Sequence, residues 1–185
     1  MRTIDPRMDN PATASGRTIG DYASAVASGE PTPGGGSVGA TVAALAAGLA
    51  EMVCNLSLAR PVEPDTAVAL TSAREEASQW RTRFLELAGE DERAYGGYRD
   101  AARLPRSSPE ERTARQSAVE AALQRSADIP LRIAKGCVAL LRALETVAER
   151  GSRHATADIR TSVYLTDAAL AGAIEMVRAN TTLMK

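Results

Sequence analysis

The chain has 185 residues, a length that suits one domain. Hydrophobic residues make up 44% of it but aromatic residues only 3%, so a core must be built mainly from Ala, Leu, Val and Ile, a composition that favours helix over sheet. The 22 basic and 23 acidic residues leave a net charge of -1 at pH 7. This balance gives no electrostatic reason for a nucleic-acid partner, and we predict none.

Three segments bear on compartment and membrane. The first 17 residues are polar and mixed in charge, which predicts a disordered tail and not a signal peptide. Residues 38–58 form the most apolar stretch, but Glu51 and Asn55 interrupt it, so we expect a buried helix and no membrane span. Cys54 and Cys137 lie far apart, without metal-ligand or redox spacing. We interpret them as buried reduced thiols of a cytoplasmic protein that has no metal site.

Two helices are expected to follow the tail. Thr18 is a good N-cap and Asp21 stands at the third helical position, so the first helix begins there and ends near Gly29. Residues 30–33 contain two prolines and form an extended connector. The second helix spans about residues 35–59. Its Gly and Ala residues at three- and four-residue spacing predict a central helix that other backbones approach closely.

A long third helix is expected over about residues 65–103, because apolar residues recur along it at helical spacing. Pro105 ends it. Ser108-Pro109-Glu110-Glu111 then supplies a cap, a proline at the first helical position and acids in the first turn. This motif predicts the start of a fourth helix.

The fourth helix is expected to reach about Arg150 with Pro130 inside it. An interior proline removes a hydrogen bond and clashes with the preceding turn, at a cost of roughly 3 kcal/mol. We therefore expect a kink or break at residues 128–130. The last helix spans about residues 156–181 and is again rich in small residues.

The predicted fold is all-α, because no segment shows sustained two-residue alternation. It is an antiparallel bundle of five or six helices, two of them long, in which a glycine-rich turn opens the central helix. This domain covers residues 18–185. Several helices are apolar on more than one side, which predicts a homodimer.

The turn Pro33-Gly34-Gly35-Gly36-Ser37 is the most distinctive motif of the chain. Three consecutive glycines have a high entropy cost on folding, so the position must need positive φ or the close approach of a ligand. The turn leads into a helix N-terminus, whose unpaired N–H groups favour an anion or a polarised carbonyl. Its spacing matches neither the dinucleotide fingerprint nor the phosphate loop. From these residues alone, a packing turn and a ligand-binding turn are equally supported.

Together with the Ala-rich helix after it, this turn resembles the opening of the methenyltetrahydrofolate cyclohydrolases and of the cyclodeaminase half of formiminotransferase-cyclodeaminase. Later segments resemble the same cyclodeaminase/cyclohydrolase family in the same order along the chain, from about Thr18 to Asn180. These segments are Asn55-Leu56-Ser57, Asp91-Glu92-Arg93-Ala94-Tyr95, Leu104-Pro105-Arg106, Asp128-Ile129-Pro130-Leu131, Ala157-Asp158 and Val177-Arg178-Ala179-Asn180.

The resemblance implies an enzyme that hydrolyses 5,10-methenyltetrahydrofolate to 10-formyltetrahydrofolate, or that releases ammonia from 5-formiminotetrahydrofolate. In the first reaction, water attacks a cationic carbon and a proton reaches the departing ring nitrogen. A carboxylate can serve both needs, so neither a metal ion nor a bound cofactor is required. Asp91, on one helical face with Tyr95, is the first catalytic candidate, and Asp158 the second. An exposed surface acid and a helix-capping acid are the respective alternatives.

The predicted substrate-binding residues come from the turn, from two arginines that could hold the glutamate tail, and from scattered polar positions. They are Gly34, Gly35, Gly36, Ser37, Asn55, Arg60, Tyr95, Arg106, His154 and Asn180. Asn55 is expected to be a buried amide, whereas for Tyr95 a place in the core is favoured over stacking on a pterin. Solvated arginines and a surface or capping His154 are the alternatives.

Near the second acid the chain departs from the family pattern, because Ala157 replaces a serine and Arg160 replaces a glycine. Two further hypotheses therefore stay open. The first is a diverged enzyme that cyclises or otherwise converts another small molecule in a biosynthetic pathway. The second is a non-catalytic helical dimer.

Overall fold

The computed structural model describes residues 16–182, and no strand occurs in that part of the chain. This confirms the predicted all-α fold. The tail predicted for residues 1–17 falls almost entirely outside the described residues. The helices are α1 (Ile19–Val26), α2 (Gly35–Leu58), α3 (Pro64–Ala102), α4 (Pro109–Arg150) and α5 (Thr156–Thr182), with a short 3-10 turn, Arg153–Ala155, before the last.

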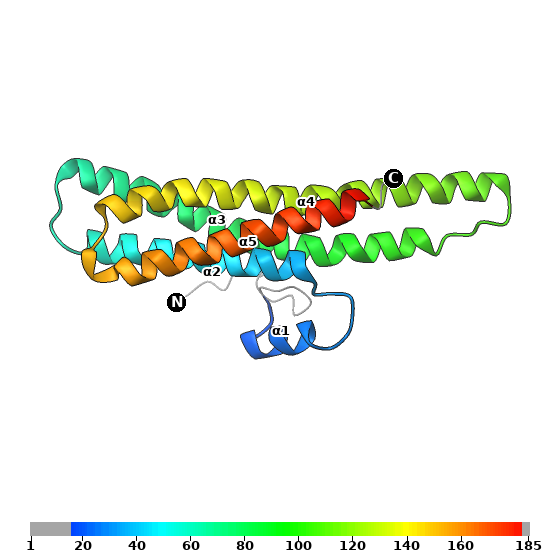
Figure 1. Ribbon diagram of the computed structural model, residues 1–185, viewed down its shortest axis with the longest axis horizontal. Coiled ribbons are helices and arrows are strands. Elements are labelled where there is room, and N and C mark those ends of the chain that lie inside the picture. The colour runs from blue at the N-terminus through cyan, green and yellow to red at the C-terminus, as the bar shows by residue number, and fades with distance from the viewer. Residues whose placement is uncertain (1–15, 183–185) are drawn as a thin grey trace, which may run out of the picture.

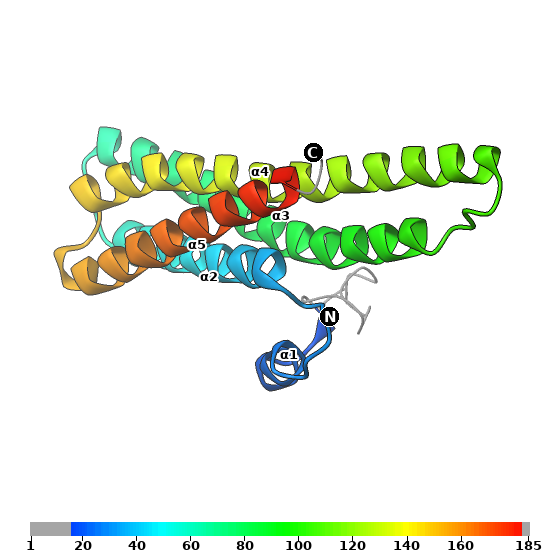
Figure 2. The ribbon, with the colours of Figure 1, turned by 45° about the vertical axis from the view of Figure 1, so that its right-hand side comes forward.

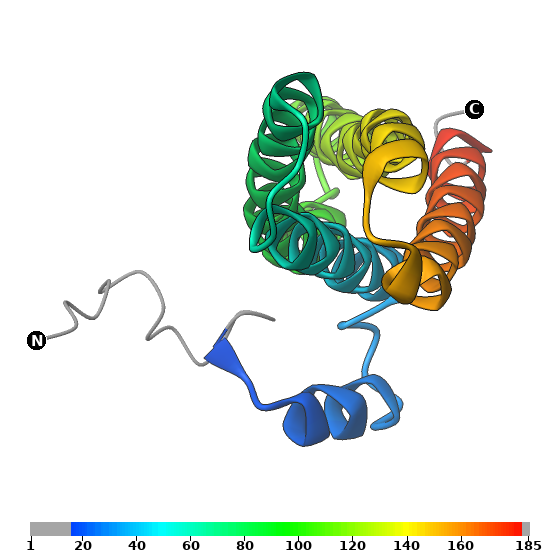
Figure 3. The same ribbon diagram turned by 90° about the vertical axis from the view of Figure 1, so that its left-hand side faces the viewer.

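Helices α2 to α5 form an antiparallel four-helix bundle, and α1 lies outside it, on the outer side of α2 (Figure 3). Each helix packs against the next, and α5 returns to pack against α2. The α3–α4 hairpin projects beyond the other two helices (Figure 1) because α3 and α4 have 39 and 42 residues, whereas α2 and α5 have 24 and 27. At about 1.5 Å per residue, the excess is roughly 20 Å. The step in the bundle therefore lies where α2 begins and α5 ends (Figure 2).

Two of the predicted helix starts are confirmed by their caps. Thr18 Oγ1 accepts a hydrogen bond from the Asp21 N–H at 3.1 Å, at the start of α1. Ser108 and Glu111 form a complete capping box at the start of α4, in which each side chain accepts the other's backbone N–H at 3.2 Å. These bonds satisfy N–H groups that have no partner within a helix.

Helix α2 is the central helix that the small residues predicted. The residues of its inner face are buried against the other helices at alternating four- and three-residue spacing, and they are Gly36, Ala40, Ala43, Ala47, Ala50, Cys54 and Ser57. By length and composition α2 is also apolar enough to cross a membrane, but 50% of its most apolar window is buried inside the bundle. That burial agrees with the prediction of a core helix. Cys54 and Cys137 are both buried and free, also as predicted.

The break expected at Pro130 does not occur, because α4 runs as one helix from Pro109 to Arg150. A proline at position 130 has no N–H for the carbonyl of Ser126, four residues earlier. The side chain of Asn180, on α5, donates to that carbonyl from Nδ2 at 2.6 Å. A bond from another helix thus replaces the missing one. The Pro130 ring is also fully buried, so packing offsets the remaining cost.

We predict that Gly136→Ala destabilises the bundle, because a Cβ at position 136 would lie 2.6 Å from Trp80 Cζ3 and 2.8 Å from Phe84 Cε1. Overpacking of this kind lowers the free energy of unfolding by about 1–3 kcal/mol, measurable by urea denaturation. Gly172→Ala is the matched control, because its added Cβ would have no neighbour within 4 Å. That variant should gain up to about 1 kcal/mol from helix propensity. Equal stability of the two variants would contradict the packing described here.

Candidate functional site

The first turn of α2 is capped by a carboxylate from another helix. Its N-cap residue is Gly34, which has no side chain to accept a hydrogen bond. The N–H of Ser37, at the third helical position, instead donates to Asp91 Oδ2 on α3 at 3.0 Å. Anions are favoured at a helix N-terminus by its unpaired N–H groups and its dipole. Asp91 therefore occupies the anion position that the glycine turn creates.

The glycines serve close approach and not positive φ. Among residues 16–182, only Gly29 has a positive φ, so of the two alternatives predicted for the turn, close approach is the one that occurs. A Cβ on Gly36 would overlap the carboxylate of Asp91, and one on Gly35 would lie 3.2 Å from Met176 Sδ. The close approach at Gly36 is thus made by the chain's own carboxylate. The same glycine therefore allows close packing of α2 against α3 and places the acid at the turn.

A cavity of about 280 Å³ opens beside Asp91, at the step of the bundle. The glycine turn, α3, α4 and α5 each supply part of its wall. The lining residues are Pro31, Thr32, Gly34, Gly35, Asp91, Ala94, Tyr95, Tyr98, Leu123, Ser126, Met176 and Asn180. The wall thus combines one acid and a few polar groups with apolar and aromatic surface, as small-molecule sites do.

The pKa of Asp91 is raised from 3.8 to about 6. Burial is the largest cause, because it disfavours the charged form, and the nearby charge of Glu92 raises the pKa further. The hydrogen bond from the Ser37 N–H acts in the opposite direction but is outweighed. A carboxyl with a pKa close to neutrality can both accept and return a proton at physiological pH.

A hydrogen-bonded network behind the cavity holds the turn. Ser37 is fully buried, and its Oγ donates to Glu92 Oε1 at 3.0 Å and lies 2.8 Å from Tyr22 OH. Thr41 Oγ1 donates to the Ser37 carbonyl at 2.9 Å and lies 3.3 Å from the same tyrosine hydroxyl. Arg17 Nη2 pairs with Glu92 Oε2 at 3.3 Å. The network joins α1, the start of α2 and the α3 turn that carries the acid.

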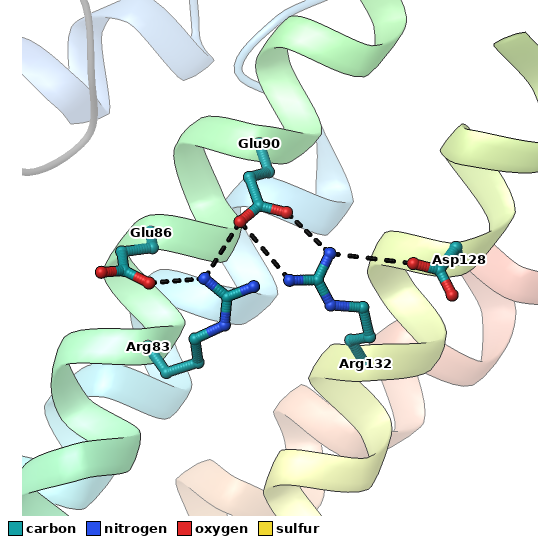
Figure 4. A network of polar contacts seen from close by, with 5 residues as sticks. All are labelled: Arg83, Glu86, Glu90, Asp128 and Arg132. Atoms are coloured by element: carbon teal, nitrogen blue, oxygen red, sulfur yellow. Dashed lines mark hydrogen bonds and ion pairs between the residues drawn. The ribbon is translucent and has the colours of Figure 1, made fainter.

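A second polar network joins α3 to α4 (Figure 4), and it includes Glu90, the residue before Asp91. Glu90 accepts from Arg132 of α4 at 2.8 Å and pairs with Arg83 at 3.0 Å. Arg83 also bonds Glu86, and Arg132 lies 3.7 Å from Asp128. Together these side chains hold α3 against α4 at the residue before Asp91, so both networks fix the register of α3 that points Asp91 into the cavity.

Several predicted site residues meet at this cavity. Gly34, Gly35, Asp91, Tyr95 and Asn180 line it, and Gly36 and Ser37 are buried directly behind it. The expectation that Tyr95 belongs to the core was wrong, because its side chain is 37% exposed. It lies one turn after Asp91, where both side chains face the cavity.

The structure does not bring the other predicted residues there. Asn55 is exposed, so the expected buried amide was wrong. The exposed residues Arg60, Arg106 and His154 lie in or next to connecting segments, and no arginine or lysine of residues 16–182 lines the cavity. Asp158 stands in the first turn of α5, 18 residues before Met176, and so about 27 Å away along the helix axis.

The departures from the family pattern share that distant location. Ala157 and Arg160 are exposed at the same end of α5 as Asp158. They therefore do not alter the wall of this chain's own cavity.

In residues 16–182, no group of three or more His, Cys, Asp or Glu side chains is placed to hold a metal ion.

Sequence reasoning missed Tyr22, Glu92, Tyr98, Ser126 and Met176 as members or supports of the site. Two of them carried a signal. Tyr98 follows Asp91 by seven residues and hence shares its helical face. Ser126 precedes Pro130 by four residues, which marks its carbonyl as one without a helical donor. The other three are placed by packing between elements far apart in the sequence.

The formiminotransferase-cyclodeaminase family matches residues 18–185 of the chain. A methenyltetrahydrofolate cyclohydrolase from Methylorubrum extorquens is 30% identical over 167 residues, which are 90% of this chain and 80% of that protein. A formimidoyltransferase-cyclodeaminase from Gallus gallus is 29% identical over 164 residues, 89% of this chain but only 30% of that longer protein.

Among solved structures, formiminotetrahydrofolate cyclodeaminase from Thermotoga maritima superposes with a TM-score of 0.80 at 27% identity. The superposition covers 91% of this chain and 80% of the other. The family match over residues 18–185 includes all the helices that build the cavity. This chain belongs to the formiminotransferase-cyclodeaminase family.

Proposed function

We propose that the chain acts on the one-carbon bridge of a tetrahydrofolate derivative. In one direction it hydrolyses 5,10-methenyltetrahydrofolate to 10-formyltetrahydrofolate, and in the related reaction it forms the methenyl bridge from 5-formiminotetrahydrofolate and releases ammonia. The observation that carries the proposal is Asp91, a carboxyl with a pKa of about 6 that lines a cavity at the glycine turn. The names of the relatives described above support the substrate class.

In the hydrolytic reaction, ionised Asp91 stabilises the cationic bridging carbon and takes a proton from the attacking water. The new C–O bond gives a neutral tetrahedral adduct. The bond from that carbon to ring nitrogen N5 then breaks, and protonated Asp91 delivers its proton to N5. The hydroxyl of the adduct loses a proton to solvent and becomes the formyl oxygen on N10.

The geometry suits this use of one carboxylate. The Ser37 N–H binds Oδ2 of Asp91 and fixes the group. No donor among the described residues binds Oδ1, so that oxygen is available to water or to N5. In the ammonia-releasing reaction, N10 attacks the carbon of the protonated formimino group, and ionised Asp91 takes the proton that N10 loses. The same carboxyl then returns this proton to the departing nitrogen, which leaves as ammonia as the C–N bond breaks. Neither sequence of steps requires a metal ion or another bound cofactor. Activity is therefore expected to survive dialysis against a metal chelator.

The direct test is to mix purified protein with 5,10-methenyltetrahydrofolate and to follow the loss of its absorbance. A parallel reaction with 5-formiminotetrahydrofolate is followed by ammonia release. At least one rate should clearly exceed the rate in buffer. If both equal it, the proposal fails.

We further propose that the chain functions as a homodimer through the outer face of α2. This face carries an apolar seam at alternating four- and three-residue spacing, the pattern of helix–helix pairing. The outer seam consists of Val38, Val42, Leu45, Leu49, Met52 and Leu56. Leu45 and Leu56 are 56% and 51% exposed in the single chain. Helix α1 lies on the same side (Figure 3) and buries none of its residues.

We also propose a cytoplasmic location, which the two thiols support. Cys54 and Cys137 are free, and burial raises their pKa values to about 11 and about 12. Both thus stay protonated and unreactive, as suits a reducing compartment. Fractionation of the host cell that places the protein outside the cytoplasm would count against this.

For activity, we predict that Asp91→Asn lowers kcat by about 100-fold or more, because an amide cannot accept the proton. In the wild type, kcat/KM should fall as the pH drops through about 6, where Asp91 becomes protonated. Steady-state rates between pH 5 and 8 test both statements. Asp100→Asn, an exposed acid on the same helix, should retain wild-type rates. A fully active Asp91→Asn enzyme would remove the assigned role but not the family.

We predict that the same Asp91→Asn substitution, which lowers activity, raises the free energy of unfolding. The folded state holds the Asp91 proton more tightly than the unfolded chain does, so stability is lost as the pH rises from 3.8 to about 6. Above pH 6 the variant, whose amide oxygen can still accept the Ser37 N–H, should therefore be more stable by about 3 kcal/mol. The gain should vanish below about pH 4. Urea unfolding at pH 8 and pH 4 measures it, and a pH-independent difference would contradict the assignment.

For assembly, light scattering of the wild type should give twice the 19.4 kDa mass of one chain. Leu45→Glu should shift the mass to that of the monomer, because a charge would be buried in the outer seam. Val138→Glu is the matched control, since Val138 is 40% exposed on α4, diagonally across the bundle from α2. A monomeric wild type, or equal effects of the two variants, would refute this interface.

A further inference from the structure

Ser126 presents a buried hydroxyl that has no partner among the described residues. Its Oγ is inaccessible to solvent and makes no hydrogen bond, although the residue lines the cavity. Helical hydroxyls commonly bond the carbonyl four residues earlier, and Ser57 and Thr113 do so in this protein. A buried hydroxyl without a partner is unfavourable and rare. Because Ser126 lines the cavity, rotation about its Cα–Cβ bond could turn this hydroxyl toward a ligand bound there.

Asn180 supplies an acceptor on a side chain that contacts the same residue. The carbonyl of Ser126 can only accept, so the amide atom that faces it at 2.6 Å must be the nitrogen. The oxygen of the amide then points away from the carbonyl, and no donor in residues 16–182 binds it. Because Asn180 also lines the cavity, its Oδ1 is an acceptor held in place by the Nδ2 bond. Pro130 makes this possible, because it leaves the Ser126 carbonyl without a helical N–H.

We propose that Ser126 Oγ and Asn180 Oδ1 bind the pyrimidine edge of the substrate's pteridine ring. That edge carries an oxo acceptor beside N–H and amino donors, so a hydroxyl donor and a fixed amide acceptor are its complement. The pair lies on α4 and α5, whereas Asp91 lies on α3. A ring bound by the pair therefore places its other half, with the one-carbon bridge, toward the acid. This inference rests on the proposed function and adds the residues that recognise the ring.

The first experiment compares Ser126→Ala with Ser117→Ala, the same substitution at an exposed position of the same helix. Affinity for 5-formyltetrahydrofolate, measured by calorimetry, should fall about 5- to 10-fold in the first variant only, the effect of one neutral hydrogen bond. The melting temperature of unliganded Ser126→Ala should not fall, because no intramolecular bond is lost. A variant that binds as tightly as the wild type would overturn the role of Ser126.

The second experiment changes the ligand as well. Wild-type protein should bind 5-formyltetrahydrofolate more tightly than its 2-desamino analogue, which lacks one donor. Asn180→Leu should bind both about equally, because the acceptor that distinguishes them is gone. Undiminished discrimination by this variant would overturn the role of Asn180.

The two proposals fail in different ways. Wild-type protein that binds 5-formyltetrahydrofolate but turns over neither bridged substrate would refute the proposed function, and the variants would still decide this inference. Wild-type protein that neither binds nor turns over a folate would refute both.

Discussion

The hydrogen bond from the Ser37 N–H to the Asp91 carboxylate is the contact on which the arrangement of this protein depends. Helix α2 begins at a glycine turn that offers no capping side chain, and a carboxylate from α3 takes the cap's place. The carboxylate fits only because residue 36 lacks a Cβ. The start of α2, the register of α3 and the position of the acid therefore depend on one another. The cavity lies beside this acid.

Two opposing effects meet at that carboxylate. The amide of Ser37 and the dipole of α2 favour its charged form, whereas burial and the charge of Glu92 disfavour it. The raised pKa shows that the second pair prevails. A fold selected for stability alone would place an amide here, since the amide would satisfy the same N–H without a buried charge. The networks around Glu90 and Ser37 both hold α3, as the retention of such a charge requires.

Local features of the sequence were sufficient for much of the fold and for part of the site. Thr18, Ser108 and Glu111 act within one helical turn, so their caps were predictable. Asp91 and Tyr95 share a helical face by spacing alone. The uninterrupted helix at Pro130 was not predictable, because its replacement donor lies 50 residues later. Helical spacing also fixes the face of a helix on which a residue lies, but it does not show which ends of two helices pack together. It therefore could not show that Asp158 stands at the opposite end of α5 from the cavity.

The acid proposed for catalysis and the residues proposed to bind the ring lie on different walls of the cavity. The acid belongs to α3 and is held by α2, whereas Ser126 and Asn180 belong to α4 and α5 and are held by each other. No hydrogen bond among residues 16–182 joins Asp91 directly to the pair. A change of heterocycle therefore requires changes at Ser126 and Asn180, with Asp91 left in place. In this chain the departures near Asp158 leave both walls intact, which argues for retained pteridine chemistry over a new substrate.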